Sequence, residues 1–293
     1  MFGLLNVRKP AGMTSRDVVN HVQRMVRPVK VGHAGTLDPL ATGVLIVCVG
    51  QATRVVEYLQ EQSKEYDGTF LLGRTSDTED VEGNVTELQD ARRPTEAEIK
   101  GVLERFRGRV MQRPPAFSAV KVAGRRAYQL ARRGEEVSLT ARPIDVHGLE
   151  LTGYQYPEMR LHVVCGSGTY LRSLGRDIGE ALGTGAVMSA LTRTAVGGFR
   201  LDDACALGQL TGESIRSHLL SPLGAVSHMA RVTLSDAEVT DIVHGKPIHT
   251  PLASGAGKVA AVDSHDRLVA VLVPGGPNQL RPARCFHQTA IES

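Results

Sequence analysis

The sequence predicts a mixed α and β fold followed by a small, barrel-like β module near the C-terminus. Helical stripes of apolar residues alternate along the chain with short apolar or alternating runs typical of strands. The 293 residues, 42% of them hydrophobic, suffice for one large or two unequal domains with a packed core. After Leu207 the pattern weakens and a separate unit starts near Arg231. We therefore expect one domain over residues 1–228 and a second over 229–293.

Capping residues and periodicity place the elements of the first domain. Thr14 and Asp17 form a capping box before an apolar stripe, and Thr95 and Glu98 form another. A third stripe ends at Gly183, a residue typical of a helix C-terminus. Helices are thus expected at 15–26, 95–106 and 170–182. Strands are expected at 44–49, which is wholly apolar, and at 159–165, which alternates.

The C-terminal unit is also patterned. Ser235 and Glu238 cap a short helix that should end at Gly245. Strand-like residues 259–262 and 268–273 flank a polar turn at 263–267. A β module of about 65 residues buries little surface by itself, so it should pack against its neighbour.

Composition excludes several classes of protein. The longest apolar runs are far shorter than the ~20 residues of a membrane span, and the first residues lack the features of a signal peptide, so we expect a cytoplasmic protein. The four cysteines, at 48, 165, 205 and 285, form no CxxC pair and no zinc spacing. They are interpreted as small hydrophobic side chains in a reducing compartment, and no metal site is expected.

The net charge of +3 hides two opposite segments. Residues 105–142 hold ten basic and two acidic side chains, whereas residues 74–104 hold nine acidic and four basic ones. A basic segment is what an RNA backbone requires, because neutralising phosphates releases their counterions. From charge alone, a solvated arginine-rich surface is the more common explanation.

The Gly-rich segment Gly32–Gly43 is the most unusual stretch. It presents His33 and Asp38 immediately before the buried strand, and Asp38 is a candidate nucleophile or base. Taken alone, an Asp-Pro pair is more often a turn, and a single histidine is more often a hydrogen-bonding residue. P-loop, dinucleotide, serine-hydrolase and zinc-hydrolase motifs do not occur. What remains is carboxylate chemistry without a metal or cofactor.

Six segments occur together and in order: 9–15 (KPAGMTS), 32–43 (GHAGTLDPLATG), 64–66 (KEY), 72–80 (LGRTSDTED), 115–121 (PAFSAVK) and 168–172 (GTYLR). The set resembles the TruB family of bacterial tRNA pseudouridine(55) synthases from about Gly3 to Leu207. The tail resembles, more weakly, the small RNA-binding module that follows in this family. The resemblance implies an α+β pseudouridine synthase fold: a mixed or antiparallel sheet core with flanking helices, plus a PUA-like C-terminal domain.

The implied reaction converts uridine 55 in the T-loop of tRNA to pseudouridine, with base flipping, no cofactor and no obligate protein partner, in a monomeric enzyme. By resemblance Asp38 is the catalytic carboxylate, Arg172 its arginine partner and Tyr66 the tyrosine against the target base. Attack at C1′, attack at C6 and removal of the 2′ proton remain open. A stacked base excludes water and disfavours an ionised carboxylate, which a permanent cation such as Arg172 offsets.

The resemblance also implies the residues that bind RNA. His33 would insert into the RNA beside the flipped nucleotide, Tyr170 and Leu191 would line the uracil pocket, and Lys9 is included among the substrate contacts. Residues from about 105 to 142 would clamp the T-arm through Lys121, Arg125, Arg126, Arg132 and Arg133. The alternatives are a pseudouridine synthase for another RNA, such as one within a guide-RNA particle, and a non-catalytic RNA-binding or tRNA-folding protein.

Overall fold

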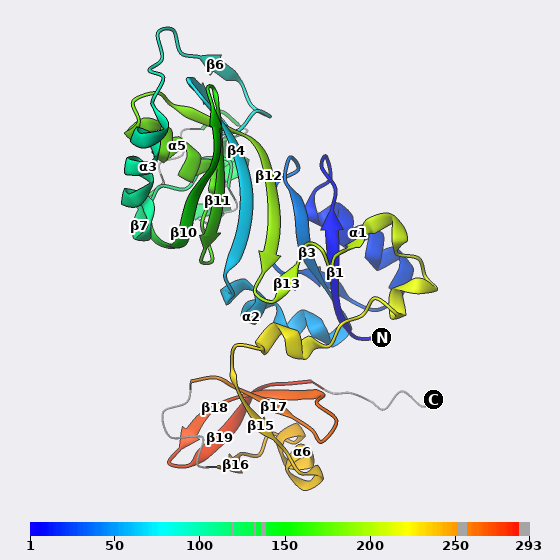
Figure 1. Ribbon diagram of the computed structural model, residues 1–293. Coiled ribbons are helices and arrows are strands. Elements are labelled where there is room, and N and C mark those ends of the chain that lie inside the picture. Colours follow the sequence, from blue (N-terminus) through cyan, green and yellow to red (C-terminus); the bar gives the residue numbers. More distant parts are fainter. Residues whose placement is uncertain (119, 123, 132, 136–138, 251–256, 287–293) are drawn as a thin grey trace.

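A long mixed sheet and a separate five-stranded sheet form the frame of the molecule (Figure 1). The computed structural model describes residues 1–118, 120–122, 124–131, 133–135, 139–250 and 257–286. The long sheet has the spatial order β14 (Cys205–Ala206), β1 (Gly3–Lys9), β3 (Thr42–Val49), β12 (Ala186–Val196), β4 (Lys64–Leu72), β11 (Glu158–Cys165), β10 (Arg142–Gln155) and β7 (Gly108–Gln112), with β2 (Val31–His33) on β3 and β13 (Phe199–Arg200) on β12.

Most neighbours in this sheet are antiparallel, but β12 and β3 pair in parallel over Thr192 with Thr42 and Arg193 with Gly43. That short contact joins the two halves of the sheet. It also places the Gly-rich segment, which ends where β3 begins, beside the middle of β12. Two hairpins lie outside this sheet: β5 (Arg74–Ser76) with β6 (Val85–Glu87), and β8 (Lys121–Val122) with β9 (Arg125–Arg126).

The expected helices form where the apolar stripes predict them. Helix α1 (Ser15–Val26) packs its valines against residues of β1 and β3. Helix α5 (Leu171–Ala181) packs Leu174 and Ile178 into the core of the other half of the sheet, with β4 and β11. Gly183 follows α5 with φ +70°, and its N–H donates to the Glu180 carbonyl. The α-helices are α1 (Ser15–Val26), α2 (Val56–Glu61), α3 (Glu96–Leu103), α4 (Ala127–Ala131), α5 (Leu171–Ala181) and α6 (Asp236–Val243). Short 3₁₀ turns are η1 (Gly50–Val55), η2 (Glu104–Phe106), η3 (Leu207–Gln209), η4 (Ser214–Arg216) and η5 (Pro222–Val226).

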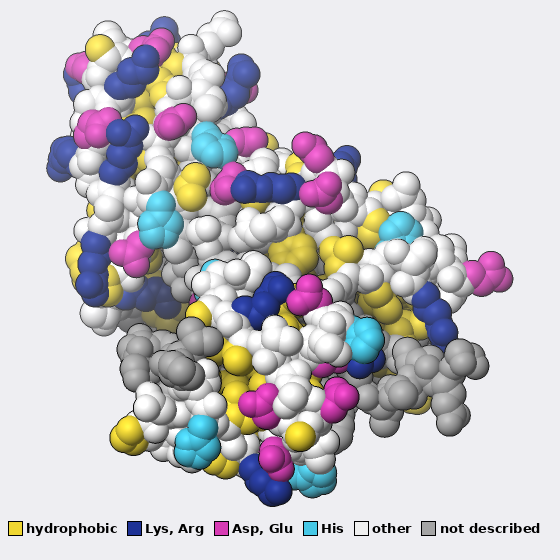
Figure 2. Space-filling model, turned by 60° about the horizontal axis from the view of Figure 1, so that its bottom comes forward, with side chains coloured by type: hydrophobic (Ala, Val, Ile, Leu, Met, Phe, Trp, Pro, Cys, Tyr) yellow, Lys and Arg dark blue, Asp and Glu magenta, His cyan; other side chains and the backbone are white. Residues whose placement is uncertain are grey.

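The second sheet has the order β15 (Ala230–Thr233), β17 (Val259–Val262), β18 (Leu268–Gly276), β19 (Gln279–Cys285) and β16 (Ile248–His249). Its inner residues, such as Val271 and Phe286, share one hydrophobic cluster with Tyr58 and Val226. The expectation that this small unit packs against its neighbour is therefore confirmed. Basic and acidic side chains are interspersed on the face seen in Figure 2, as expected for a small net charge.

Only part of the basic segment, residues 105–142, lies outside the long sheet. Gly108–Gln112 is the edge strand β7, and Arg142 is the first residue of β10. Arg107 is held in place by Glu104 and by the Leu149 carbonyl. The part between β7 and β10, residues 113–141, is called the basic excursion below. It is shorter than the segment 105–142 expected from the charge count. In the described part of the chain, no helix has the length and apolar character needed to cross a membrane.

Candidate active site

The loop that carries Asp38 is tied down on both sides. It runs from β2 to β3, and Ser15 at the start of α1 bonds with both the N–H and the C=O of Leu37, at 2.9 and 3.2 Å. Lys9, at the end of β1, donates from Nζ to the carbonyls of Pro39 (3.2 Å), Met13 (2.6 Å) and Pro10 (2.9 Å). These contacts fix the backbone on either side of Asp38. Its carboxylate remains 37% exposed and so can be reached from outside.

Arg172, the second residue of α5, faces this carboxylate. Its Nε lies 3.0 Å from Asp38 Oδ2, and its Nη2 donates to Asp38 Oδ1 at 3.3 Å, so the pair is bidentate. The arginine side chain is only 8% exposed. An arginine on a helix is usually exposed to solvent. Here the guanidinium is buried, and the carboxylate of Asp38 pairs with its charge.

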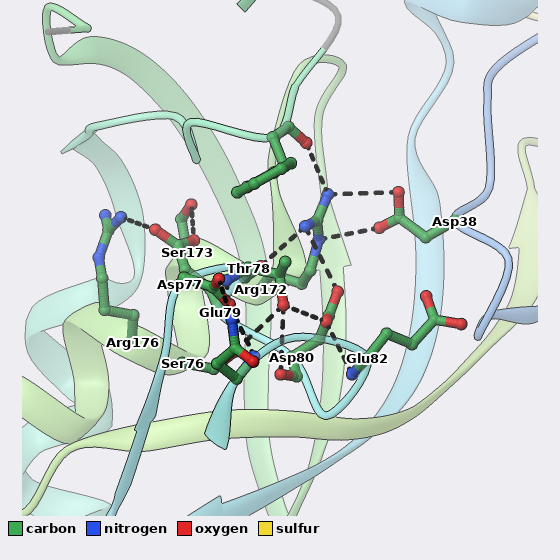
Figure 3. Close-up of polar contacts among 12 residues, drawn as sticks. Asp38, Ser76, Asp77, Thr78, Glu79, Asp80, Glu82, Arg172, Ser173 and Arg176 are labelled. Carbon is green, nitrogen blue, oxygen red and sulfur yellow. Dashed lines mark hydrogen bonds and ion pairs between the residues drawn. The ribbon is translucent and has the colours of Figure 1, made fainter. Parts of the chain in front are cut away.

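The other donors of Arg172 are used by the protein as well (Figure 3). Nη1 donates to the Thr78 carbonyl at 2.8 Å and lies 3.4 Å from Asp80 Oδ2, while Nη2 also donates to the Phe117 carbonyl at 3.2 Å. The Asp80 side chain is buried and accepts a hydrogen bond from the Thr78 hydroxyl. Three hydrogen bonds and two ion-pair contacts, with Asp38 and Asp80, therefore hold the guanidinium in place.

Tyr66 and Leu191 lie in one apolar cluster with Leu37 of the same loop. Tyr66 is 8% exposed near the start of β4, where it pairs with Arg193 of the neighbouring strand β12. Burial raises the pKa of the Tyr66 phenol, and the positive charge of Arg193 partly opposes that shift. The phenol is thus neutral at physiological pH. The structure brings Asp38, Arg172, Tyr66 and Leu191 to one place.

Tyr170 precedes α5 and is held by Gln112 of β7. The Gln112 side chain donates to the Tyr170 carbonyl (3.0 Å) and accepts from its N–H (2.9 Å). The guanidinium of Arg142 lies 5.3 Å from the centre of the Tyr170 ring, within the range of a cation–π contact. The N-terminus of α5, and with it Arg172, is thereby attached to the base of the basic excursion.

His33 and Lys9 differ in their burial and in their hydrogen bonding. His33, at the end of β2, is half-buried, and its Nδ1 has no hydrogen-bond partner among the residues that the structure describes. Burial and the charges of Arg16 and Arg193 lower its pKa. Lys9 is completely buried, and its ammonium is occupied by three carbonyls. The expected contact of Lys9 with RNA is not supported by this geometry, because the group points into the protein.

The predicted clamp residues follow Phe117, whose carbonyl accepts from Arg172. Arg125 and Arg133 are exposed. The backbones of Lys121 and Arg126 pair in the β8–β9 hairpin. Arg132 lies outside the described residues.

Several site residues were not singled out from the sequence. Asp80 lay within a quoted motif without a role, and Gln112 carried no local signal. Arg193 is 1% exposed and donates to the carbonyls of Val44 and Gly35, so it holds both ends of the Asp38 loop. Glu82 lies beside Asp80, and burial together with the charges of Asp80 and Asp38 raises its pKa (Figure 3). Among the described residues, no cluster of His, Cys, Asp and Glu is arranged to hold a metal ion.

Comparisons with known proteins show the family of the chain. The TruB family pseudouridylate synthase N-terminal domain matches residues 23–171, and two C-terminal domains of tRNA pseudouridylate synthase B and tRNA pseudouridine synthase II match 172–231 and 229–287. The chain is 38% identical to tRNA pseudouridine synthase B of Dehalococcoides mccartyi, over 98% of this chain and 97% of the relative. It is 41% identical to the protein of that name from Mycobacterium tuberculosis, over 96% of each.

Solved structures give the same fold. A Cbf5–Nop10–Gar1 complex matches with a TM-score of 0.75 and 28% identity, over 98% of this chain and 84% of the other. An H/ACA ribonucleoprotein bound to a substrate RNA containing 2′-deoxyuridine matches with a TM-score of 0.72 and 25% identity, over 98% and 86%. The expected α+β fold, with its mixed sheet and a curled C-terminal sheet, is confirmed. On its sequence, its fold and its family matches, the chain belongs to the TruB family of pseudouridylate synthases.

Proposed function

We propose that this enzyme isomerises uridine 55 in the T-loop of tRNA to pseudouridine, with Asp38 as the catalytic carboxylate. The observation that carries the proposal is the bidentate Asp38–Arg172 pair. It places a partly exposed carboxylate beside an almost fully buried cation, next to the apolar cluster of Tyr66 and Leu191. The tRNA relatives and the family match support the substrate class.

The chemistry needs nothing beyond the nucleotide. Uridine and pseudouridine are isomers: the C1′–N1 bond breaks, the uracil turns, C5 bonds to C1′, and the C5 proton is lost while N1 gains one. Attack at C1′, attack at C6 or removal of the 2′ proton each requires Asp38 to be ionised. Arg172 keeps its charge at any physiological pH and stabilises that ionised form after the base has displaced water.

A flipped uracil would lie against Tyr66 and Leu191, with Tyr170 at the edge of the pocket. Because its pKa is raised, Tyr66 stays a neutral phenol, which suits stacking on a base and hydrogen bonding to it. Extruding a base costs a few kcal/mol, and stacking on Tyr66 and the neutral imidazole of His33 offsets part of that cost. Lys9, whose contacts are internal, positions the Asp38 loop instead of meeting RNA.

The basic excursion would bind the T-arm phosphates through Lys121, Arg125, Arg126, Arg132 and Arg133. The exposure of Arg125 and Arg133 and the attachment of the excursion to α5 through Gln112 support this arrangement. We further propose a monomeric cytoplasmic enzyme with a catalytic domain at 1–228 and a PUA-like RNA-binding domain at 229–293.

An unmodified tRNA transcript incubated with the purified protein alone tests the proposal, with pseudouridine mapped along the RNA. We expect one modified position, in the T-loop, with the wild-type protein. Asp38→Asn should bind tRNA with unchanged affinity and form no pseudouridine, as followed by tritium release from 5-tritiated uridine. Modification outside the T-loop would favour another RNA as substrate, and full activity of Asp38→Asn would remove the role of the carboxylate.

A further inference from the structure

Glu79 occupies an unusual position between two groups that hold Arg172. It lies in the turn that follows β5, with Thr78 before it and Asp80 after it, and its backbone has φ +65°. A left-handed conformation is uncommon for a residue with a side chain, so surrounding contacts have to maintain it. Its carboxylate is 11% exposed.

The side chain of Glu79 points to α5 and is held there by two residues (Figure 3). Ser173 Oγ donates to Glu79 Oε2 at 2.6 Å, and Arg176 Nη1 forms an ion pair with Oε1. Arg176, one turn beyond Arg172 and 14% exposed, also pairs with Asp177 at 2.7 Å. Burial raises the pKa of Glu79, and Ser173 and Arg176 oppose that shift.

The backbone of the turn is fixed on its other side by β12. Glu79 accepts from the Met188 N–H at 3.1 Å, and Val81 donates to the Met188 carbonyl at 3.0 Å. With both sides held, the Thr78 carbonyl and the Asp80 carboxylate meet Nη1 of Arg172 on the opposite side of the turn from the Glu79 side chain. The guanidinium plane, and therefore its bidentate contact with Asp38, depends on where these two acceptors lie.

Arg176 also reaches the basic excursion. Its Nη2 donates to the carbonyl of Arg113 at 2.9 Å, while Arg172 donates to that of Phe117. The two arginines of one helix face thus connect the turn, the start of the excursion and Asp38.

We propose that Glu79, clamped by Ser173 and Arg176, is a positioning residue for catalysis: it fixes the acceptors that orient Arg172 toward Asp38. This inference rests on the proposed function of the Asp38–Arg172 pair. The hydrogen bond and ion pair of the Glu79 side chain go to α5 and not to Asp38, so its loss should slow the chemical step and leave tRNA binding unchanged.

The variant Glu79→Gln tests this with little change of shape. It keeps an oxygen acceptor for Ser173 and removes the charge that pairs with Arg176. The single-turnover rate at saturating enzyme should fall on the order of 10-fold or more, because small misplacements of a catalytic pair are costly. The Kd for tRNA should stay within about 2-fold, a split that a general loss of structure does not produce. Glu180→Gln is the matched control, since Glu180 lies 4.0 Å from Arg176 Nε, is 63% exposed and belongs to α5 instead of the turn.

A double-mutant cycle with Arg172→Lys separates positioning from an independent effect. If Glu79 acts through Arg172, adding Glu79→Gln to Arg172→Lys should lower the rate by less than 3-fold more. Should Glu79→Gln fail to fold, Ser173→Ala gives the same readouts with a smaller rate loss, because only one hydrogen bond is removed. Three results would each overturn the proposal. The folded Glu79→Gln variant could react at the wild-type single-turnover rate, or it could lose rate and tRNA binding equally. In the double-mutant cycle, the two substitutions could also lower the rate by the product of their separate effects. Activity that survives Asp38→Asn contradicts the proposed function itself and is therefore a distinguishable result.

Discussion

The protein uses arginine in two contrasting ways. Arg172 and Arg193 are buried, and their guanidinium groups donate to carboxylates and carbonyls of loops far apart in the chain. In the basic excursion, Arg125 and Arg133 are exposed, and neither forms an ion pair with a carboxylate that the structure describes. Under the proposed function, the interior arginines position Asp38 for the reaction, whereas the exterior ones keep their charge available for phosphates. Substitutions in the two regions should therefore affect different measured quantities.

Arg172→Lys should give the largest effect. A lysine carries the charge but cannot meet Asp38 in bidentate fashion and also reach Thr78, Asp80 and Phe117. We expect a loss of about 3 kcal/mol in transition-state stabilisation, or on the order of 100-fold in single-turnover rate, with little change in tRNA affinity. Arg200→Lys, at a 52% exposed position, is the control. A variant that weakens binding as much as it slows the reaction would contradict the division between the two regions.

Lys9→Met tests whether an interior cation acts by holding backbone. Removing the ammonium leaves the carbonyls of Pro10, Met13 and Pro39 without their donor, and such losses cost about 2 kcal/mol. The free energy of unfolding in urea should fall by about that amount, and the rate should fall with it because the loop of Asp38 loosens. Lys30→Met, at an exposed position, should change neither quantity. If Lys9→Met weakened tRNA binding without loss of stability, the original expectation of an RNA contact would return.

Local pattern was enough to predict several elements of the fold, including the helix α5 that carries Arg172, but not the strands β4 and β12 that carry Tyr66 and Leu191. The capping box at Thr14 and the apolar stripe predicted α1 with the bounds observed, and the alternation from Met159 to Cys165 predicted β11. These features depend on neighbours within one or two turns of the chain. Resemblance, in contrast, was needed to connect Asp38 with Arg172, which are 134 residues apart in sequence.

Other parts of the site could not be predicted because their function depends on tertiary contacts. In the sequence, Lys9 is one of two adjacent basic residues, Arg8 and Lys9. Only the fold shows that three carbonyls accept hydrogen bonds from its ammonium. Likewise Gln112 has the polarity of a surface residue, yet it is 1% exposed and binds the backbone of Tyr170. The charge count delimited a basic segment at 105–142 and the resemblance assigned it to a clamp, although pairing with β10 places 108–112 in the sheet.

Replacing Arg125, Arg126, Arg132 and Arg133 with alanine tests the exterior arginines. Each lost phosphate contact lowers the slope of log K against log salt by about 0.7 to 0.9, so the slope should flatten. We expect tRNA binding to weaken by about 1.5 kcal/mol, or on the order of 10-fold, at moderate salt, with the rate at saturating enzyme nearly unchanged. An unchanged salt slope would show that these side chains do not meet phosphates.

The smallest effect should come from His33, a titratable group that is half-buried and lies near the charges of Arg16 and Arg193. Burial, followed by the charges of Arg16 and Arg193, lowers the pKa of His33 below its usual value of 6.5. The unfolded chain then binds a proton more readily than the folded one, so stability falls as the pH drops from 6.5 toward the folded pKa. Above pH 6.5 both states carry a neutral imidazole, and this contribution is constant.

His33→Gln removes the titration and should reduce the loss of unfolding free energy between pH 7.5 and pH 5 by less than about 1 kcal/mol. The exposed His249, changed to glutamine, controls for the loss of an imidazole. Titration of the His33 ring by NMR gives the direct measurement, with a midpoint below 6.5 expected. A midpoint above 6.5 would mean that burial and the charges of Arg16 and Arg193 do not dominate the surroundings of the ring.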